Sequence, residues 1–306
     1  SGVEVEDLER ELGLTDDSTG GGTSGATGDD AGASTPMVEL RDVTKTFVDT
    51  DGTEFTAIED VSFTVEDRPG HGELRAVLGP SGCGKSTILN LVAGLEEPTS
   101  GEVLVGGEPV TGPGPERGMV FQNYSSMPWM DVLDNVAYGL RLQGMGRSQR
   151  IAKARKLIER VGLEGHEAKY PDELSGGMRQ RVAIARTLAV EPKILLMDEP
   201  FGALDVHTRH DMQNFIQDIW GSREATILFV THDVSEAIYL ADRILVLSSS
   251  PGTLVEEIQV DLQRPRTQQT KQSGEFRRFE QQILQLIHEV GGGGGQLEGD
   301  GVTMSV

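Results

Sequence analysis

The feature that most constrains the fold is the sequence Gly-Pro-Ser-Gly-Cys-Gly-Lys-Ser at residues 79–86. It matches the phosphate-loop pattern G-x-x-x-x-G-K-[ST] at every fixed position. An apolar, strand-like segment (74–78) precedes it, and a helix-like segment (85–95) follows it. This order lets backbone N–H groups converge on an anion at the start of a helix. The segment therefore predicts an α/β domain built around a phosphate-binding loop.

Each residue type in the loop suits nucleotide binding. The glycines allow the backbone to close around the β- and γ-phosphates. Lys85 adds a positive charge, and Ser86 offers a hydroxyl to Mg²⁺. Cys83 is the only cysteine of the chain, and we expect it to pack within the loop rather than act as a nucleophile. The predicted nucleotide-binding residues here are Gly79, Pro80, Ser81, Gly82, Cys83, Gly84, Lys85, Ser86 and Thr87.

Strand-like and helix-like segments alternate around the loop. Residues 38–47 and 57–65 alternate apolar with polar side chains, as half-exposed antiparallel strands do. The apolar runs 194–197 and 226–230 are typical of buried parallel strands. Helical spacing occurs over 152–161, 178–189 and 205–220. The chain is therefore predicted to be a mixed α/β protein with an antiparallel beginning and a largely parallel core.

The two ends differ in composition from the middle. Residues 1–36 are acidic and rich in Gly, Ser and Thr, and residues 291–306 begin with a run of glycines. Both are predicted to be disordered or flexible. The folded domain is expected over 37–272, followed by an amphipathic helix over 273–290. We expect the apolar stripe of this helix to pack on its own domain rather than on a partner; it comprises Phe276, Phe279, Ile283, Ile287 and Val290.

Charge and composition exclude several classes of protein. The net charge of −22 disfavours non-specific binding to nucleic acid or anionic lipid. The single cysteine fits a reducing compartment, and we expect neither a membrane-spanning segment nor a secretory signal. Few of the basic residues are lysines, since arginines predominate. Such a surface is typical of proteins from salt-loving organisms, although a simply acidic protein is the alternative.

Two further motifs point to ATP chemistry. Asp198 and Glu199 end the apolar run 194–197, and a carboxylate at the tip of a buried strand beside a phosphate loop can bind Mg²⁺. The alternative is that Asp198 and Glu199 belong to an ordinary solvent-exposed turn without a role in binding. The sequence Leu-Ser-Gly-Gly-Met-Arg-Gln at 174–180 begins another helix with its own serine and glycines. It indicates a protein that completes its ATP site with a segment from a second copy.

Five segments together resemble the ATP-binding subunits of ABC transporters, in the order and at the spacing of that family: 79–87, 174–180, 194–200, 203–205 and 231–233. The resemblance covers residues 37–247. It implies the fold of an ABC-type ATPase of the P-loop class, with an antiparallel β subdomain, a mainly parallel RecA-like core and a helical subdomain that carries residues 174–180.

The resemblance also implies roles for single residues in ATP hydrolysis. Glu199 corresponds to the general base or water-positioning carboxylate, His232 to the switch that contacts the γ-phosphate, and Gln122 to the residue that senses Mg²⁺ and water. The implied catalytic residues are thus Glu199, His232 and Gln122. The implied Mg²⁺ ligands are Ser86, Gln122 and Asp198.

Other implied roles concern the second copy and the base of ATP. Ser175, Gly176 and Gly177 would face the γ-phosphate bound by the opposite subunit, and Asp205 would couple the two sites. Phe47 falls where the family places an aromatic ring against adenine. Its distance from the phosphate loop is longer than usual because of extra residues near 49–55 and 67–71, and a core phenylalanine is the alternative.

Six further segments indicate one branch of this family, because they resemble the ATP-binding subunits of importers of nitrate, alkanesulfonates and taurine: 112–122, 128–129, 134–136, 201–205, 212–213 and 219–220. The implied partners are a second ATPase subunit, either identical or paired, a transmembrane permease and, indirectly, a solute-binding protein, with no nucleic acid. The implied location is peripheral, on the cytoplasmic side of the cell membrane. A soluble ABC-type ATPase outside a transporter and the ATPase half of an exporter are the alternatives.

The segment between Gln122 and Val136 is the candidate docking surface for the permease. It has few charges and carries four large side chains, whose burial within their own domain is the alternative: Tyr124, Met127, Trp129 and Met130.

The charge pattern gives a testable prediction about salt. If the acidic surface is adapted to high salt, screening will reduce self-repulsion, and the melting temperature will rise between low and molar salt. We expect a rise of at least about 5 °C, equivalent to roughly 1–2 kcal/mol for a domain of this size. Differential scanning calorimetry over a salt series measures it, and a flat response would contradict the halophilic interpretation.

Overall fold

The computed structural model describes residues 35–66, 72–122, 125–222 and 225–291. The predicted disorder of the acidic N-terminal tail and of the glycine-rich C-terminal tail therefore concerns residues almost wholly outside the described ranges. The insertion at 67–71 and Tyr124 also lie outside them.

A four-stranded antiparallel sheet opens the described part of the chain. Its order is β2-β1-β4-β5, with β1 at Val38–Val48, β2 at Glu54–Val65, β4 at Ser100–Val105 and β5 at Glu108–Pro109. The two predicted strands at the start of the domain are confirmed, although β2 begins three residues earlier than expected. Bulges interrupt the pairing of β1 with β2 between Leu40 and Thr46.

A six-stranded sheet of order β10-β9-β3-β8-β7-β6 forms the core. Its strands are β3 (Leu74–Leu78), β6 (Arg117–Val120), β7 (Ile194–Asp198), β8 (Thr226–Thr231), β9 (Arg243–Leu247) and β10 (Leu254–Gln259). All neighbours are parallel except β10, which runs antiparallel to β9. The largely parallel core predicted from the apolar runs is confirmed.

Side-chain alternation along the central strands divides the apolar core into two clusters. In β3, Leu74, Ala76 and Leu78 face one cluster, whereas Val77 faces the other. The second cluster is completed by the antiparallel sheet and by α2 (Lys85–Ala93). Strands buried on both faces need apolar residues at every position, which explains why 194–197 and 226–230 lack polar alternation.

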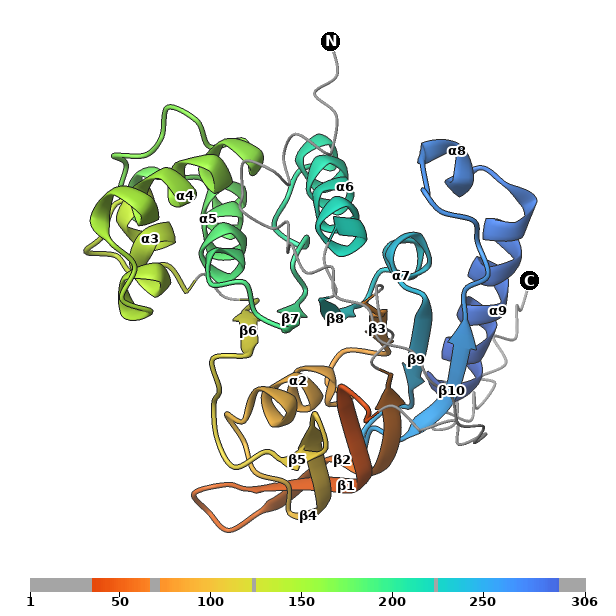
Figure 1. Ribbon diagram of the computed structural model, residues 1–306. Coiled ribbons are helices and arrows are strands. Elements are labelled where there is room, and N and C mark those ends of the chain that lie inside the picture. The colour runs from red at the N-terminus through yellow and green to blue at the C-terminus, as the bar shows by residue number, and fades with distance from the viewer. Residues whose placement is uncertain (1–34, 67–71, 123–124, 223–224, 292–306) are drawn as a thin grey trace, which may run out of the picture. The chain divides into compact units, whose positions relative to one another are not determined.

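Helices cover the opposite face of the central sheet, away from α2 and the antiparallel sheet (Figure 1). The helices α3 (Val132–Leu142), α4 (Arg147–Arg160) and α5 (Gly176–Ala189) pack on one another. After β7 and β8 come α6 (Val206–Ser222) and α7 (Val234–Leu240). The described residues also contain two short helices, η1 (Pro171–Glu173) and α8 (Gln268–Lys271), and the 18-residue helix α9 (Gly274–Gly291).

The C-terminal helix α9 packs on the same domain. Phe276 and Ile283 are buried in the main cluster, and Phe279 and Ile287 are partly buried against it. Four of the five residues of the predicted stripe thus face their own core, whereas Val290 does not belong to this cluster. Among the described residues, no helix combines the length and the apolar content that a bilayer crossing requires.

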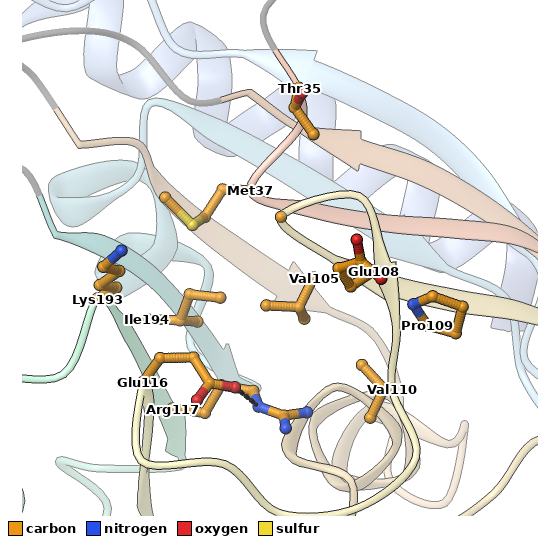
Figure 2. Close-up of a pocket in the computed structure, with 11 residues that line it drawn as sticks. Thr35, Met37, Val105, Glu108, Pro109, Val110, Glu116, Arg117, Lys193 and Ile194 are labelled. Carbon is orange, nitrogen blue, oxygen red and sulfur yellow. Dashed lines mark hydrogen bonds and ion pairs between the residues drawn. The ribbon is translucent and has the colours of Figure 1, made fainter.

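A pocket of about 420 Å³ lies between the antiparallel sheet and the beginnings of β6 and β7 (Figure 2). Met37, Val105, Val110 and Ile194 form much of its lining. The guanidinium of Arg117 also lines it and donates to Glu116 Oε1, Gly112 O and Val92 O. Because β6 and β7 run away from this pocket, the residues that follow their C-terminal ends lie elsewhere.

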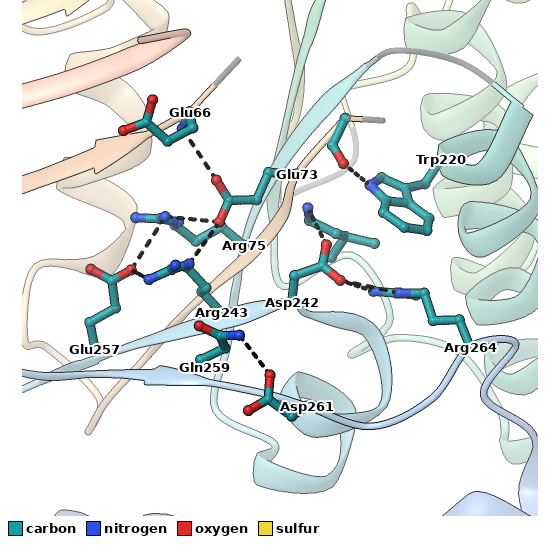
Figure 3. Close-up of polar contacts among 12 residues, drawn as sticks. Glu66, Glu73, Arg75, Trp220, Asp242, Arg243, Glu257, Gln259, Asp261 and Arg264 are labelled. Carbon is teal, nitrogen blue, oxygen red and sulfur yellow. Dashed lines mark hydrogen bonds and ion pairs between the residues drawn. The ribbon is translucent and has the colours of Figure 1, made fainter. Parts of the chain in front are cut away.

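A buried ion pair, extended by two partly exposed side chains, joins β3, β9 and β10 (Figure 3). Glu73 and Arg75 are each 1% exposed, and Arg75 Nη2 lies 2.9 Å from Glu73 Oε1. Arg243 Nε lies 3.4 Å from the same oxygen, and Glu257 Oε1 lies 3.3 Å from Arg75 and 2.8 Å from Arg243. Two carboxylates thus compensate two guanidinium groups, as buried charges require.

Candidate nucleotide site

The phosphate loop leads from β3 into α2 as predicted. Gly84 is the N-terminal cap residue of α2, has a left-handed φ of 83°, and makes no side-chain capping bond. The first N–H groups of a helix lack partners within the helix. Here they point toward the loop, where together with the helix dipole they can bind an anion.

Glycine at position 84 is required by close packing as well as by backbone conformation. A Cβ there would lie 2.3 Å from Ile58 Cγ2 and 2.7 Å from Ala57 O, both in β2. Gly82 has a similar φ of 80°, but a Cβ there would meet nothing within 4 Å. The antiparallel sheet therefore supports the loop from below at Gly84.

The turn at Gly252, which the sequence motifs do not predict, supports the phosphate loop from another side. A Cβ at Gly252 would lie 2.0 Å from Cys83 O. Its N–H donates to Ala57 O at 2.9 Å, and its carbonyl accepts from Glu59 N–H at 3.0 Å. The only signal in the sequence is a Ser-Pro-Gly turn far from the loop, and nothing in that turn indicates its contact.

Cys83 and Lys85 have the expected environments. Cys83 is 1% exposed, and burial raises the pKa of its thiol, as suits a packing role. Lys85 is 7% exposed, and its ammonium donates to Gly79 O at 2.9 Å and Pro80 O at 2.7 Å. The charge of Lys85 is thus held at the loop.

Asp198 has an environment that suits a divalent cation. It is 7% exposed, and its Oδ1 has no hydrogen-bond partner among the described residues. Burial raises the pKa of its carboxyl, while a hydrogen bond from the Ser86 side chain lowers it. A buried carboxylate oxygen beside a serine hydroxyl fits the oxygen ligands that Mg²⁺ prefers.

Glu199 links the ends of three strands. It follows β7 with a φ of 44°, and its N–H donates to Val230 O in β8 at 3.0 Å. Its Oε2 accepts from Gln122 Nε2, beyond β6, at 3.0 Å. Its Oε1 lies 3.1 Å from His232 Nδ1, after β8. Because the carboxyl ends of parallel strands meet at one edge of the sheet, three residues distant in sequence form one cluster.

The segment 174–180 contains the start of α5, which begins at Gly176, two residues earlier than expected. Ser175 is the exposed cap residue, and its Oγ accepts from Met178 N–H at 3.3 Å. A Cβ at Gly177 would lie 3.3 Å from Leu204 Cδ2, so this helix start packs beside the turn at 203–205.

Asp205 caps α6 within its own chain. Its Oδ1 accepts from His207 N–H and Thr208 N–H, each at 3.1 Å. The hydrogen bonds from Thr208 lower the pKa of the Asp205 carboxyl, which keeps the side chain charged at the start of the helix, where the dipole favours a negative charge.

Phe47 lies on the strand pair that supports the phosphate loop. It pairs with Phe55, and two residues earlier Lys45 pairs with Ile58, the residue against Gly84. The ring is half-buried, and Lys45 Nζ lies 4.9 Å from its centroid. An aromatic face at this edge is compatible with adenine stacking.

A phosphate loop, a buried carboxylate and a glutamate held at the same sheet edge define an ATP-binding cassette, and comparisons with known proteins identify its family. Residues 58–202 match the ABC transporter family. An ABC transporter ATP-binding protein of Methanocaldococcus jannaschii is 47% identical over 252 residues, which cover 82% of this chain and 91% of that protein. The chain therefore belongs to the ATP-binding proteins of ABC transporters, and it binds and hydrolyses ATP.

Two other relatives carry more specific names. The nitrate import ATP-binding protein of Synechocystis sp. is 46% identical over 256 residues, covering 82% of this chain and 94% of the relative. The taurine import ATP-binding protein of Burkholderia thailandensis is 52% identical over 209 residues, covering 68% and 79%.

A solved ATP-binding cassette has the same fold. It is a dimer in a post-hydrolysis state, bound to ADP and inorganic phosphate, with a TM-score of 0.67 and 31% sequence identity. The match covers 74% of this chain and 100% of that one. The predicted ABC ATPase fold is thus confirmed.

The packing at Gly84 predicts different effects for two similar substitutions. Gly84→Ala should cost more than about 3 kcal/mol of stability or displace the loop, because the new methyl group would overlap β2. Gly82→Ala should cost only about 1–2 kcal/mol, from the left-handed conformation alone. Urea denaturation and ATP binding measure both variants.

Gly82→Ala is the matched control, since both positions have positive φ. We expect it to retain ATP binding while Gly84→Ala loses it. Equal losses in the two variants would contradict a steric requirement at position 84.

Proposed function

We propose that this protein is the motor subunit of an ABC importer for a small solute such as nitrate, a sulfonate or taurine. The relatives named for nitrate and taurine import support this class of solute. Among the segments that resemble nitrate, alkanesulfonate and taurine importers, 212–213 and 219–220 lie on α6, which packs on the apolar core.

The observation that carries the catalytic part of the proposal is the position of Glu199 between Gln122 and His232. These two contacts hold the carboxylate at the sheet edge next to Asp198. There it can accept a proton from a water that attacks the γ-phosphate. We propose that Ser86, Gln122 and Asp198 bind Mg²⁺, which would neutralise charge developing on the phosphates.

A second copy would complete the site. Ser175, which is exposed, and the half-buried Gly176 and Gly177 form a helix start, and such a helix end can bind a γ-phosphate held by the opposite subunit. The solved dimeric cassettes support this assembly. ATP shared by both copies would hold the dimer closed, and hydrolysis would release it. Asp205, beside the start of α5, would then lie near the dimer interface.

Glu199→Gln tests both the catalytic role and the closed dimer. The amide keeps the size and one acceptor oxygen, but it cannot accept the proton of the attacking water. We expect ATP binding to persist and steady-state hydrolysis to fall by about 100-fold or more. Because ATP then remains bound, a dimer should accumulate, as size-exclusion chromatography with light scattering will detect.

The double variant Glu199→Gln/Ser175→Arg is the control for the shared site. The arginine would obstruct the helix start without touching the phosphate loop of its own chain, so we expect ATP binding to a monomer. Normal turnover of Glu199→Gln would refute the catalytic assignment. A normal dimer of the double variant would refute only the shared site.

The proposed permease surface includes Trp129, whose side chain is 72% exposed. Buried Asn135 holds the preceding loop: its Nδ2 donates to Met127 O at 3.1 Å and to Met130 O at 2.8 Å, and its Oδ1 accepts from Met127 N–H at 2.8 Å. Met127 and Met130 are half-buried. A fixed loop that presents a large exposed ring can form part of a docking surface for a helix of the permease. This contact would lie at the cytoplasmic face of the membrane.

Trp129→Glu tests the permease surface. We expect the wild-type chain to co-purify with a membrane-spanning protein from detergent-solubilised membranes, and the variant to lose it. ATP-dependent dimerisation of the variant should be unchanged, because the loop anchored by Asn135 remains. Retention of the membrane protein by the variant would contradict this surface.

A further inference from the structure

His232 depends on the turn around it for its position. Its side chain is 63% exposed, and its ring contacts Glu199 at 3.1 Å. An exposed imidazole with this contact is not held by packing. What aims it at Glu199 is therefore the backbone between Thr231, which ends β8, and Asp233, which caps α7.

A closed set of hydrogen bonds fixes that turn. Thr231 Oγ1 accepts from Asp233 N–H at 3.1 Å and donates to Glu236 Oε2 at 2.6 Å. Asp233 Oδ1 accepts from Glu236 N–H at 3.0 Å. The Thr231 hydroxyl thus uses both its donor and its acceptor capacity, and Glu236 accepts the hydrogen bond that it donates.

The other oxygen of Glu236 reaches a different helix. Its Oε1 accepts from Gln213 Nε2 of α6 at 2.9 Å. Gln213 is 2% exposed and Glu236 is 6% exposed, so solvent does not compete for this bond. Lys271 Nζ lies 3.5 Å from Gln213 Oε1. Because a carboxylate only accepts and an ammonium only donates, these two neighbours determine the orientation of the Gln213 amide.

We infer that Glu236 and Gln213 are positioning residues for ATP hydrolysis, which hold His232 against Glu199 through Thr231. They also join α7, which follows His232, to α6, which Asp205 caps at its start. The inference rests on the proposed role of His232, and it adds a buried connection between the His232 turn and the Asp205 turn.

Gln213→Glu tests the connection in the full-length chain. It would replace the amide that donates to Glu236 Oε1 with a carboxylate oxygen, and Lys271 faces the other oxygen of residue 213, so the bond that joins α6 to α7 would be lost. We expect kcat for ATP hydrolysis to fall roughly tenfold, since one hydrogen bond to a charged group is at stake. The KM for ATP should stay within about twofold, because the phosphate loop is untouched.

The reciprocal variant Gln213→Glu/Glu236→Gln is the rescue. The amide introduced at position 236 would donate to the carboxylate introduced at position 213 and accept from Thr231, so we expect kcat within about threefold of wild type. Thr231→Val should lower kcat as Gln213→Glu does, whereas Thr231→Ser, which keeps the hydroxyl, should not. Melting temperatures of all variants identify any that fail to fold. Failure of the rescue in a folded protein would overturn the inference.

His232→Ala separates this inference from the function on which it rests. If His232→Ala lowers turnover, adding Gln213→Glu should lower it no further, because the positioned group is gone. An additive loss would overturn the positioning role. Full turnover of His232→Ala alone would instead refute the proposed role of His232.

Discussion

The close contact between Gly84 and β2 is the constraint on which the nucleotide site depends. Because residue 84 has no Cβ, Ala57 and Ile58 can lie directly beneath the start of α2. That contact joins the antiparallel sheet to the central sheet and fixes the direction of the first N–H groups of the helix. The turn at Gly252 completes the support. A loop so held keeps its geometry without relying on a ligand, which reduces the ordering entropy that binding would otherwise cost.

The parallel sheet supplies the second requirement, which is convergence. Gln122, Glu199 and His232 follow three adjacent strands, β6, β7 and β8, and parallel neighbours bring such residues to one edge. The register between β7 and β8 fixes the positions of the two acidic residues, because Asp198 pairs with Val230 and Glu199 N–H donates to Val230 O. A shift of one residue in either strand would turn the carboxylates away from the phosphate loop.

Much of this site could be predicted from local patterns, because the phosphate loop, the acidic end of β7 and the helix start at Ser175 each depend on consecutive residues. The strands 74–78 and 194–197 were recognisable as apolar runs. The supports were not recognisable. Gly252 contacts Cys83, and Gln213 contacts Glu236, only through tertiary packing. Gln122 could be assigned only by family resemblance, because its role depends on a contact with Glu199, which follows the neighbouring strand β7.

The hydrogen bond between α6 and α7 can couple movements of the turn at Asp205 to movements of the turn at His232. Asp205 caps α6, and His232 directly precedes Asp233, which caps α7, so both helices start beside residues assigned to the nucleotide site. The bond from Gln213 to Glu236, together with the bond that Tyr239 Oη donates to Asn214 Oδ1 at 2.9 Å, joins the two helices. Packed elements joined in this way shift together between discrete arrangements rather than deform gradually. A change at the turn of Asp205 would therefore be transmitted to the turn of His232 as a rigid displacement, without requiring any movement of the phosphate loop.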